Sequence, residues 1–191
     1  MDPMTLWLTD DHQANKLLER DPLALLLAMA LDQQIPMEKA FKGPYVLRER
    51  TGADLSAADL AERLDLAELF SQTPAIHRFP GSMAGRMQEL CRALVADYDG
   101  RAEALWEDAA DGKELLRRLK ALPGFGTQKA QIFVALLGKQ YGVRPQGWRE
   151  AAGAYGEDGV TKSVADVTGP ESLLKVRAFK QAAKAEAKKK A

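Results

Sequence analysis

The sequence predicts an all-α protein, and three observations support this fold class. No stretch of the 191 residues alternates apolar and polar side chains regularly enough to indicate a β-strand. Apolar residues instead recur at spacings of three and four, which places them on one face of a helix. Several of these runs begin at Asp or Ser with an acidic residue three positions later, a pattern typical of helix N-termini.

The first half of the chain is predicted to form six helices, over residues 10–19, 23–32, 36–50, 57–64, 66–71 and 82–98. The second begins after an Asp-Pro pair at 21–22 and is apolar on nearly every face, which indicates a central, buried helix. A Gly-Pro pair at 43–44 is expected to kink or split the third. Ser56, Asp65 and Ser82 are the expected N-caps of the last three.

The second half contains a helical hairpin with a glycine-rich turn, and its helices are expected over residues 102–108, 111–121, 127–138, 149–155 and from 170 onward. Asp111 and Thr127 are the expected caps of the two hairpin helices, and Gly138 is the expected stop. Glycine lacks a Cβ, so a phosphate can approach the turn at Gly124 and Gly126, where the second helix directs its free N–H groups. The alternative is a corner whose glycines serve steric purposes only.

The net charge of zero hides an uneven distribution along the chain. Residues 1–112 carry a net charge of −9, residues 113–149 carry +7, residues 150–174 carry −4 and residues 175–191 carry +6. The +7 block surrounds the glycine turn and favours a phosphate-bearing ligand, although a solvated basic helix face is the alternative. Its basic residues are Lys113, Arg117, Arg118, Lys120, Lys129, Lys139, Arg144 and Arg149.

The composition excludes several classes of protein. Hydrophobic residues make up 46% and charged residues 28%, the balance of an ordinary globular protein. The longest strongly apolar run, residues 23–31, is far shorter than the roughly 20 residues of a membrane span. No secretory leader pattern opens the chain, so we expect a cytoplasmic protein. Cys91 is the single cysteine, which excludes an internal disulfide and a four-cysteine zinc or iron–sulfur site.

Three segments resemble the helix-hairpin-helix (HhH-GPD) superfamily of DNA glycosylases, which act in base excision repair. They are LPGFG at 122–126, MAGRMQELCRALVADYDG at 83–100 and LLLAMALDQQIP at 25–36. The resemblance extends over residues 21–140 in the family's order, and is closest to short bacterial proteins described only as base-excision-repair proteins of this type.

The resemblance implies a fold of two all-α lobes with the DNA and an extruded base in the cleft between them. One lobe would comprise residues 22–138, ending in the hairpin. The other would comprise residues 1–21 and 139–191, with a basic C-terminal tail at 175–191. The base must leave the helical stack because its glycosidic bond cannot be reached inside the duplex.

The resemblance also implies roles for individual residues. Backbone N–H groups near Gly124, Gly126 and Gln128 would hold a phosphate 3′ to the lesion. Gln33 and Gln34 would fill the space left by the extruded base, although a polar helix end without a partner is the alternative. Backbone carbonyls of Lys120, Leu122 and Phe125 could hold a K⁺ or Na⁺ ion. The residues expected to contact double-stranded DNA are Gln33, Gln34, Leu122, Gly124, Phe125, Gly126, Thr127, Gln128 and Lys129.

Two departures from the family pattern bear on the chemistry. Members that cleave the DNA strand carry a lysine where this chain has Gln128, and Lys129 lies about 100° further round the helix, where we expect it to meet a phosphate. The slot of the family's catalytic aspartate falls on residues 146–148, none of which is acidic. Glu150 and Asp32 are the two candidate replacements, and each has a purely structural alternative; a third interpretation is that no catalytic carboxylate is present.

Some isolated residues remain open to two interpretations. Trp148, Tyr141 and Tyr45 either stack on an extruded base or belong to the core. His77 either contacts DNA or is solvated in its loop. Lys180, Lys184 and Lys188 share one face of the last helix and either follow a phosphate strand or form a solvated tail.

Taken together, these features predict a monomeric, monofunctional DNA glycosylase that needs no redox cofactor and no iron–sulfur cluster and acts without a membrane. A second hypothesis is a damage- or structure-sensing DNA-binding protein that has the hairpin but not the catalytic aspartate. A third is an all-α protein-interaction module without a nucleic-acid partner, which fits the zero net charge but not the +7 block.

Overall fold

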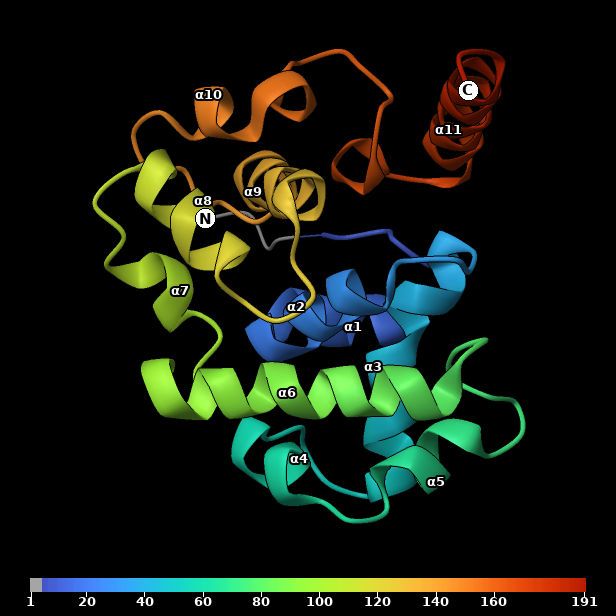
Figure 1. Ribbon diagram of the computed structural model, residues 1–191, viewed down its shortest axis with the longest axis vertical. Helices are drawn as coiled ribbons and strands as arrows, with labels where there is room; N and C mark the ends of the chain where they lie inside the picture. The colour runs from blue at the N-terminus through green and yellow to red at the C-terminus, as the bar shows by residue number, and fades with distance from the viewer. Residues whose placement is uncertain (1–4) are drawn as a thin grey trace.

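The computed structural model describes residues 5–191, and over these residues the fold is entirely helical, as predicted (Figure 1). Within the same range, no helix combines the length and apolar composition needed to cross a membrane. The helices are α1 (His12–Arg20), α2 (Pro22–Leu31), α3 (Met37–Thr51), α4 (Ala57–Glu62), α5 (Leu66–Ser71), α6 (Pro80–Tyr98), α7 (Ala104–Glu107), α8 (Gly112–Lys120), α9 (Thr127–Gln140), α10 (Trp148–Ala152) and α11 (Pro170–Lys189), with 3₁₀ turns η1 (Gly153–Gly156) and η2 (Val164–Asp166).

Helix α2 is the buried central element that its composition predicts. Every residue from Leu23 to Leu31 is buried, and the helix packs against α1, α3 and α6. Its start is fixed locally: the Asp21 carboxylate accepts a hydrogen bond from the Leu23 N–H at 3.0 Å, and Pro22 occupies the first turn. Below it in Figure 1, α6 crosses the molecule with α4 and α5 packed against its lower side.

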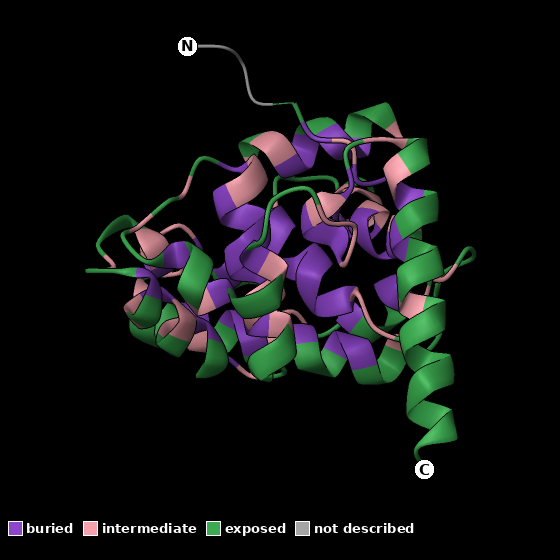
Figure 2. Cartoon of the chain, turned by 90° about the horizontal axis from the view of Figure 1, so that it is seen from above, coloured by how far each residue is buried: buried purple, intermediate pink, exposed green. Residues whose placement is uncertain are grey.

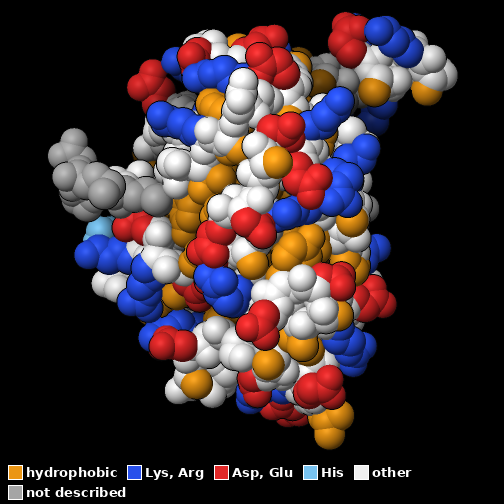
Figure 3. Space-filling model, turned by 90° about the vertical axis from the view of Figure 1, so that its left-hand side faces the viewer, with side chains coloured by type: hydrophobic (Ala, Val, Ile, Leu, Met, Phe, Trp, Pro, Cys, Tyr) orange, Lys and Arg blue, Asp and Glu red, His pale blue; other side chains and the backbone are white. Residues whose placement is uncertain are grey.

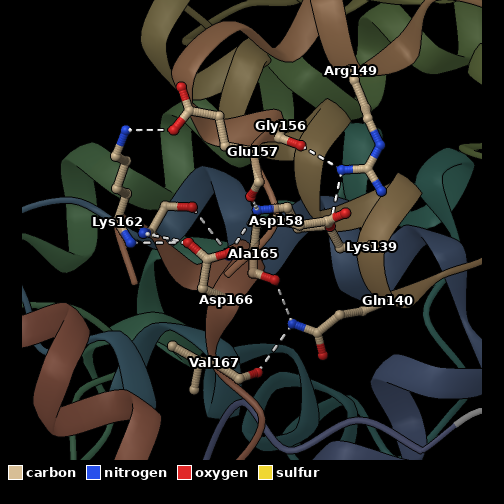
Figure 4. Close-up of polar contacts among 11 residues, drawn as sticks. Lys139, Gln140, Arg149, Gly156, Glu157, Asp158, Lys162, Ala165, Asp166 and Val167 are labelled. Carbon is tan, nitrogen blue, oxygen red and sulfur yellow. Dashed lines mark hydrogen bonds and ion pairs between the residues drawn. The ribbon is translucent and has the colours of Figure 1, made fainter. Parts of the chain in front are cut away.

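Helix α9 organises the other half of the molecule, packing against α8, α10, η1 and η2. Figure 4 shows how the segment after α10 is tied to it. Lys139 Nζ lies 2.6 Å from Asp166 Oδ1, and both side chains are nearly buried. Gln140 Nε2 donates to the carbonyls of Ala165 and Val167 at 2.8 and 3.0 Å. These contacts hold the irregular chain between α10 and α11 against the hairpin.

Two predicted caps are confirmed. Ser56 Oγ accepts from the Asp59 N–H at 3.2 Å at the start of α4. Asp111 accepts from the Glu114 N–H at 2.8 Å at the start of α8. Both bonds join residues three positions apart, so the local sequence is sufficient to specify them.

Two other predicted caps are wrong, and a third lacks its hydrogen bond. Asp65 occupies the N-cap position of α5, but its side chain makes no capping bond; its carboxylate accepts from Arg63 Nε at 2.7 Å. Ser82 lies inside α6, which begins two residues earlier at Pro80, where proline's fixed φ suits the first turn. Thr127 is the first helical residue of α9, and the cap position belongs to Gly126 without any side-chain bond.

Two glycines have packing roles that the sequence does not reveal. Gly138 does not end its helix, since α9 continues to Gln140; a Cβ added at Gly138 would lie 2.3 Å from the Trp148 ring. Gly43 lies inside α3, which is not split by the following proline, and a Cβ there would lie 2.7 Å from the Leu31 side chain. In both places glycine permits a close approach between elements.

The C-terminal helix α11 differs from the others in how little of it is covered. Only Leu173 and Val176 are buried, and Figure 2 shows its second half exposed and projecting beyond the body of the molecule. The predicted division into two lobes stays a prediction, since a single hydrophobic cluster includes residues of both.

Candidate nucleic-acid interface

The hairpin turn between α8 and α9 combines buried side chains with an exposed backbone. The side chains of Leu122 and Phe125 are buried, and the Phe125 ring meets the edge of Phe133 at 6.3 Å between centroids. Gly124 and Gly126 between and beside these anchors are exposed. The buried side chains of Leu122 and Phe125 therefore fix the position of the exposed backbone at Gly124 and Gly126.

Backbone conformation and packing account for only one of the two glycines in the turn. Gly124 has a φ of +82°, a left-handed conformation that favours glycine. Gly126 has a φ of −78°, and a Cβ added there would meet no atom within 4 Å. Neither backbone conformation nor packing requires glycine at position 126. The interpretation that the glycines serve steric purposes within the fold therefore accounts for Gly124 but not for Gly126.

Backbone donors gather at this open strip. Within the part of the chain that the structure describes, the N–H groups of Gly126, Thr127, Gln128 and Lys129 donate no hydrogen bond; the first helical bond of α9 runs from Ala130 to Gly126 at 3.0 Å. No side chain caps them. Four free donors and the positive end of the helix dipole thus face the exposed side of the turn, an arrangement suited to an anion.

The carbonyls expected to bind a monovalent cation lie in the same turn. The Leu122 carbonyl already accepts the Phe125 N–H at 3.2 Å, which leaves it one lone pair for an ion. Within the described residues, no cluster of three or more His, Cys, Asp or Glu side chains could hold a metal ion. A K⁺ or Na⁺ site at Lys120, Leu122 and Phe125 stays a prediction.

The basic block around the turn is less available than its sequence suggests. Figure 3 shows Lys and Arg side chains interspersed with Asp and Glu on the side of the molecule where α7 and α8 lie. Such pairing lowers the local field, so the charge of this block is weak support for phosphate binding. Half of its members form ion pairs: Arg117 and Arg118 with Glu114, Arg118 also with Asp108, Lys139 with Asp166, and Arg149 with Asp158.

Lys129 is directed inward rather than toward a phosphate as we expected. Its Nζ donates to the Ala30 carbonyl at 3.1 Å and to Gln33 Oε1 at 3.2 Å. Burial lowers the pKa of this ammonium, and the nearby Asp32 carboxylate partly offsets the effect. Lys129 therefore joins the first turn of α9 to the C-terminal end of α2. Its neighbour Gln128 instead donates from Nε2 to Tyr155 Oη at 2.9 Å.

The loop after α2 is held at Gln33 by residues distant in sequence. His77 is buried, and its Nε2 lies 2.9 Å from the Gln33 carbonyl. Its Nδ1 accepts the Phe79 N–H at 3.0 Å, so Nε2 carries the proton and donates. Burial lowers the pKa of His77 and favours this neutral form. The next residue, Gln34, is exposed with a φ of +61°, unusual for a residue other than glycine.

Asp32 lines a groove of 990 Å³ between this loop and α11. Burial raises the pKa of its carboxyl, and Lys180 and Lys129 partly offset that rise. The groove also contains Gln33 and Gln34, so the structure brings together three of the residues expected to be functional. Lys129 connects this groove to the hairpin turn through its bond to Gln33.

The chain matches no protein-family model, no curated protein and no solved structure.

Glu150 lies away from this groove, exposed in the first turn of α10. Residues 146–148, where the resemblance places the aspartate, pack against Gly112 at the start of α8. The Gly112 N–H donates to the Gln146 carbonyl at 2.8 Å, and a Cβ at Gly112 would lie 2.6 Å from the Trp148 backbone. This close packing works against the small loop shift that would be needed to bring Glu150 to the groove.

The aromatic residues and His77 have structural roles. Trp148 is buried over Gly138, and Tyr141 is buried with its hydroxyl donating to the Leu18 carbonyl at 3.1 Å, which confirms the core interpretation for both. Tyr45 is half-buried against the core. His77 is neither solvated nor free to contact DNA, because it is buried and bonds to the Gln33 carbonyl. Gln33 lies 44 positions earlier in the chain, so no local sequence pattern indicates this contact.

Proposed function

We propose that this protein binds DNA through the hairpin turn and hydrolyses the N-glycosidic bond of a damaged base, with Asp32 as the catalytic carboxylate. The observation that carries the proposal is Gly126: its exposed position requires no glycine for the fold, yet four free N–H groups converge beside it. An incoming phosphate oxygen would satisfy these donors and accounts for the absence of a side chain.

The groove supports the catalytic part of the proposal. Its volume of 990 Å³ lies at the upper end of the range for small-ligand sites, roughly 300–1,000 Å³. An extruded nucleotide in the groove would meet Asp32 on the wall formed by the loop after α2. A carboxylate there can stabilise a cationic sugar and position water, so that water oxygen bonds to the sugar carbon, the base departs with the bonding electrons, and Asp32 accepts the water proton.

The proposed reaction stops at the abasic site. Gln128 occupies the place of the strand-cleaving lysine, and the Lys129 ammonium is held by the Ala30 carbonyl and Gln33 Oε1. An amine held by two acceptors within the fold is poorly placed to attack the abasic aldehyde.

The test is incubation of the protein with duplexes that carry uracil, hypoxanthine, an alkylated purine, 8-oxoguanine or mismatched adenine, followed by alkali. Strand breaks that depend on alkali are the expected result with at least one duplex. Breaks without alkali would contradict the monofunctional assignment, and no breaks with any duplex would contradict glycosylase activity.

A second candidate is a DNA-binding protein without catalysis. The close packing of residues 146–148, where the family carries its aspartate, favours this alternative. This alternative predicts that the protein slows the migration of duplex DNA in a gel but produces no abasic site.

A further inference from the structure

Helix α11 extends far beyond the part of it that packs. Its last buried residue is Val176, and it continues to Lys189, a further length of about 20 Å. Figure 2 shows this second half exposed beside the body of the molecule. An exposed extension of this length adds little to the hydrophobic core, so its side chains are available for a ligand.

Two unpaired cations of α11 line the groove, together with Arg177, which is ion-paired. Lys180 and Lys184 line the groove one helical turn apart, and neither has an acidic partner within 4.0 Å in the part of the chain that the structure describes. Arg177, by contrast, is paired with Glu38, and Lys175 is paired with Glu171.

The opposite wall adds a third cation and an aromatic ring. Arg78 lines the groove and likewise forms no ion pair among the described residues; its guanidinium lies 5.3 Å from the centroid of the Phe79 ring. Phe79 is 43% exposed although it is a large apolar side chain. Gln34 and Gln181 also line the groove.

We propose that this groove binds an unpaired DNA strand, with phosphates at Lys180, Lys184 and Arg78 and a base stacked on Phe79. Rows of cations beside an exposed aromatic ring are what single-strand sites use, because every base offers a face for stacking. Lys180 and Lys184 are separated by about 6 Å along the helix, comparable to one nucleotide step of an extended strand. A groove of 990 Å³ accommodates a nucleotide or two but not a duplex.

The inference rests on the proposed function only for the origin of the unpaired strand, which is a duplex opened beside the hairpin. Asp32 lies in the same groove, and its carboxylate would repel a phosphate near the loop after α2. Lys180 and Lys184 therefore place two phosphates along α11, Arg78 takes a third on the opposite wall, and the sugar and base lie toward the loop after α2.

The test is fluorescence anisotropy with a labelled ten-nucleotide oligothymidylate and three proteins: wild type, Lys180→Glu with Lys184→Glu, and Lys175→Glu with Lys189→Glu. The two variants make the same charge change on the same helix, but only the first changes residues that line the groove. We expect the first to bind at least tenfold more weakly and its log–log salt slope to fall by about 1.4, for two phosphates lost from a single strand. The second should remain within about threefold of wild type.

A Phe79→Ala variant tests the stacking contact, and its affinity is expected to fall roughly 5- to 150-fold, the equivalent of one base–aromatic stack. Circular dichroism and thermal unfolding of each variant confirm that the fold is retained. The inference is overturned if wild type does not bind the oligonucleotide, if both charge variants lose affinity equally, or if poly-glutamate competes as well as oligothymidylate.

Failure of this inference and failure of the proposed function give different results. Binding of the oligonucleotide at the groove without alkali-dependent breaks in any duplex contradicts only the glycosylase activity. Alkali-dependent breaks by a protein that does not bind the oligonucleotide contradict only the single-strand groove.

Discussion

The hairpin turn and the groove present two different kinds of polar chemistry. At the turn, the donors are backbone N–H groups whose position is fixed by the buried side chains of Leu122 and Phe125, while nearby arginines are ion-paired. In the groove, the polar groups are side chains: a partly desolvated carboxylate at Asp32 and the unpaired Lys180 and Lys184. Backbone donors cannot change rotamer, so in the proposed function the turn fixes the DNA strand and the groove acts on it.

The largest expected effect separates the two candidate carboxylates. Asp32→Asn should lower the rate of base release roughly 10²- to 10⁴-fold, the usual contribution of a general base. Glu150→Gln should leave the rate within about twofold, because Glu150 lies outside the groove. Single-turnover kinetics on the duplex that shows activity is the measurement. A loss with Glu150→Gln but not with Asp32→Asn would reverse the assignment.

A second prediction compares a glycine needed for packing with one that is not. Gly138→Ala should lower the free energy of unfolding by about 1–3 kcal/mol, because its Cβ would overlap the Trp148 ring. Gly126→Ser should change it by less than about 0.5 kcal/mol, because the added Cβ meets nothing and serine is a preferred residue at this N-cap position. Urea unfolding of both variants measures the difference. Equal losses would show that the turn is more closely packed than its geometry indicates.

The burial of Asp32 should be measurable as a stability cost at neutral pH. A carboxyl whose folded pKa is raised stabilises the fold in its protonated form, and this contribution is lost as pH rises through that pKa. Asp32→Asn should therefore be more stable than wild type by about 0.5–2 kcal/mol at pH 7, with the difference shrinking toward pH 4. Unfolding across this range is the measurement, and a difference independent of pH would contradict it.

The smallest effect concerns His77, which holds the loop after α2. Its folded pKa is lowered by burial, so its contribution to stability is complete above about pH 6.5 and is lost as pH falls below that value. We expect a slope of at most about 1.4 kcal/mol per pH unit, absent in His77→Gln. His12→Gln, at an exposed position, is the control and should retain the slope.

The elements that the sequence predicts correctly depend on neighbouring residues. Asp21 and Pro22 specify the start of α2, and Asp111 specifies the start of α8, through bonds spanning two or three positions. The hairpin turn is likewise a local pattern. These features need only the φ preferences and side-chain donors of residues adjacent in the chain.

The features that the sequence does not predict depend on residues far apart. The expected positive field around the turn is reduced by partners such as Asp166, 27 positions after Lys139. The inward direction of Lys129 depends on Ala30, 99 positions earlier. The groove itself forms only because α11 returns to the loop after α2. These contacts join residues too far apart in the sequence for periodicity or motif spacing to predict them.

The measurement that most directly tests the central claim is the affinity of Gly126→Asp for duplex DNA. Gly126 is the N-cap of α9, a position where aspartate is a preferred residue, so the substitution should preserve or slightly raise the stability of the fold. It would place a carboxylate on the free N–H groups that we assign to a phosphate. We predict at least tenfold weaker duplex binding with unchanged thermal stability. Unchanged affinity in a folded Gly126→Asp protein would contradict the account.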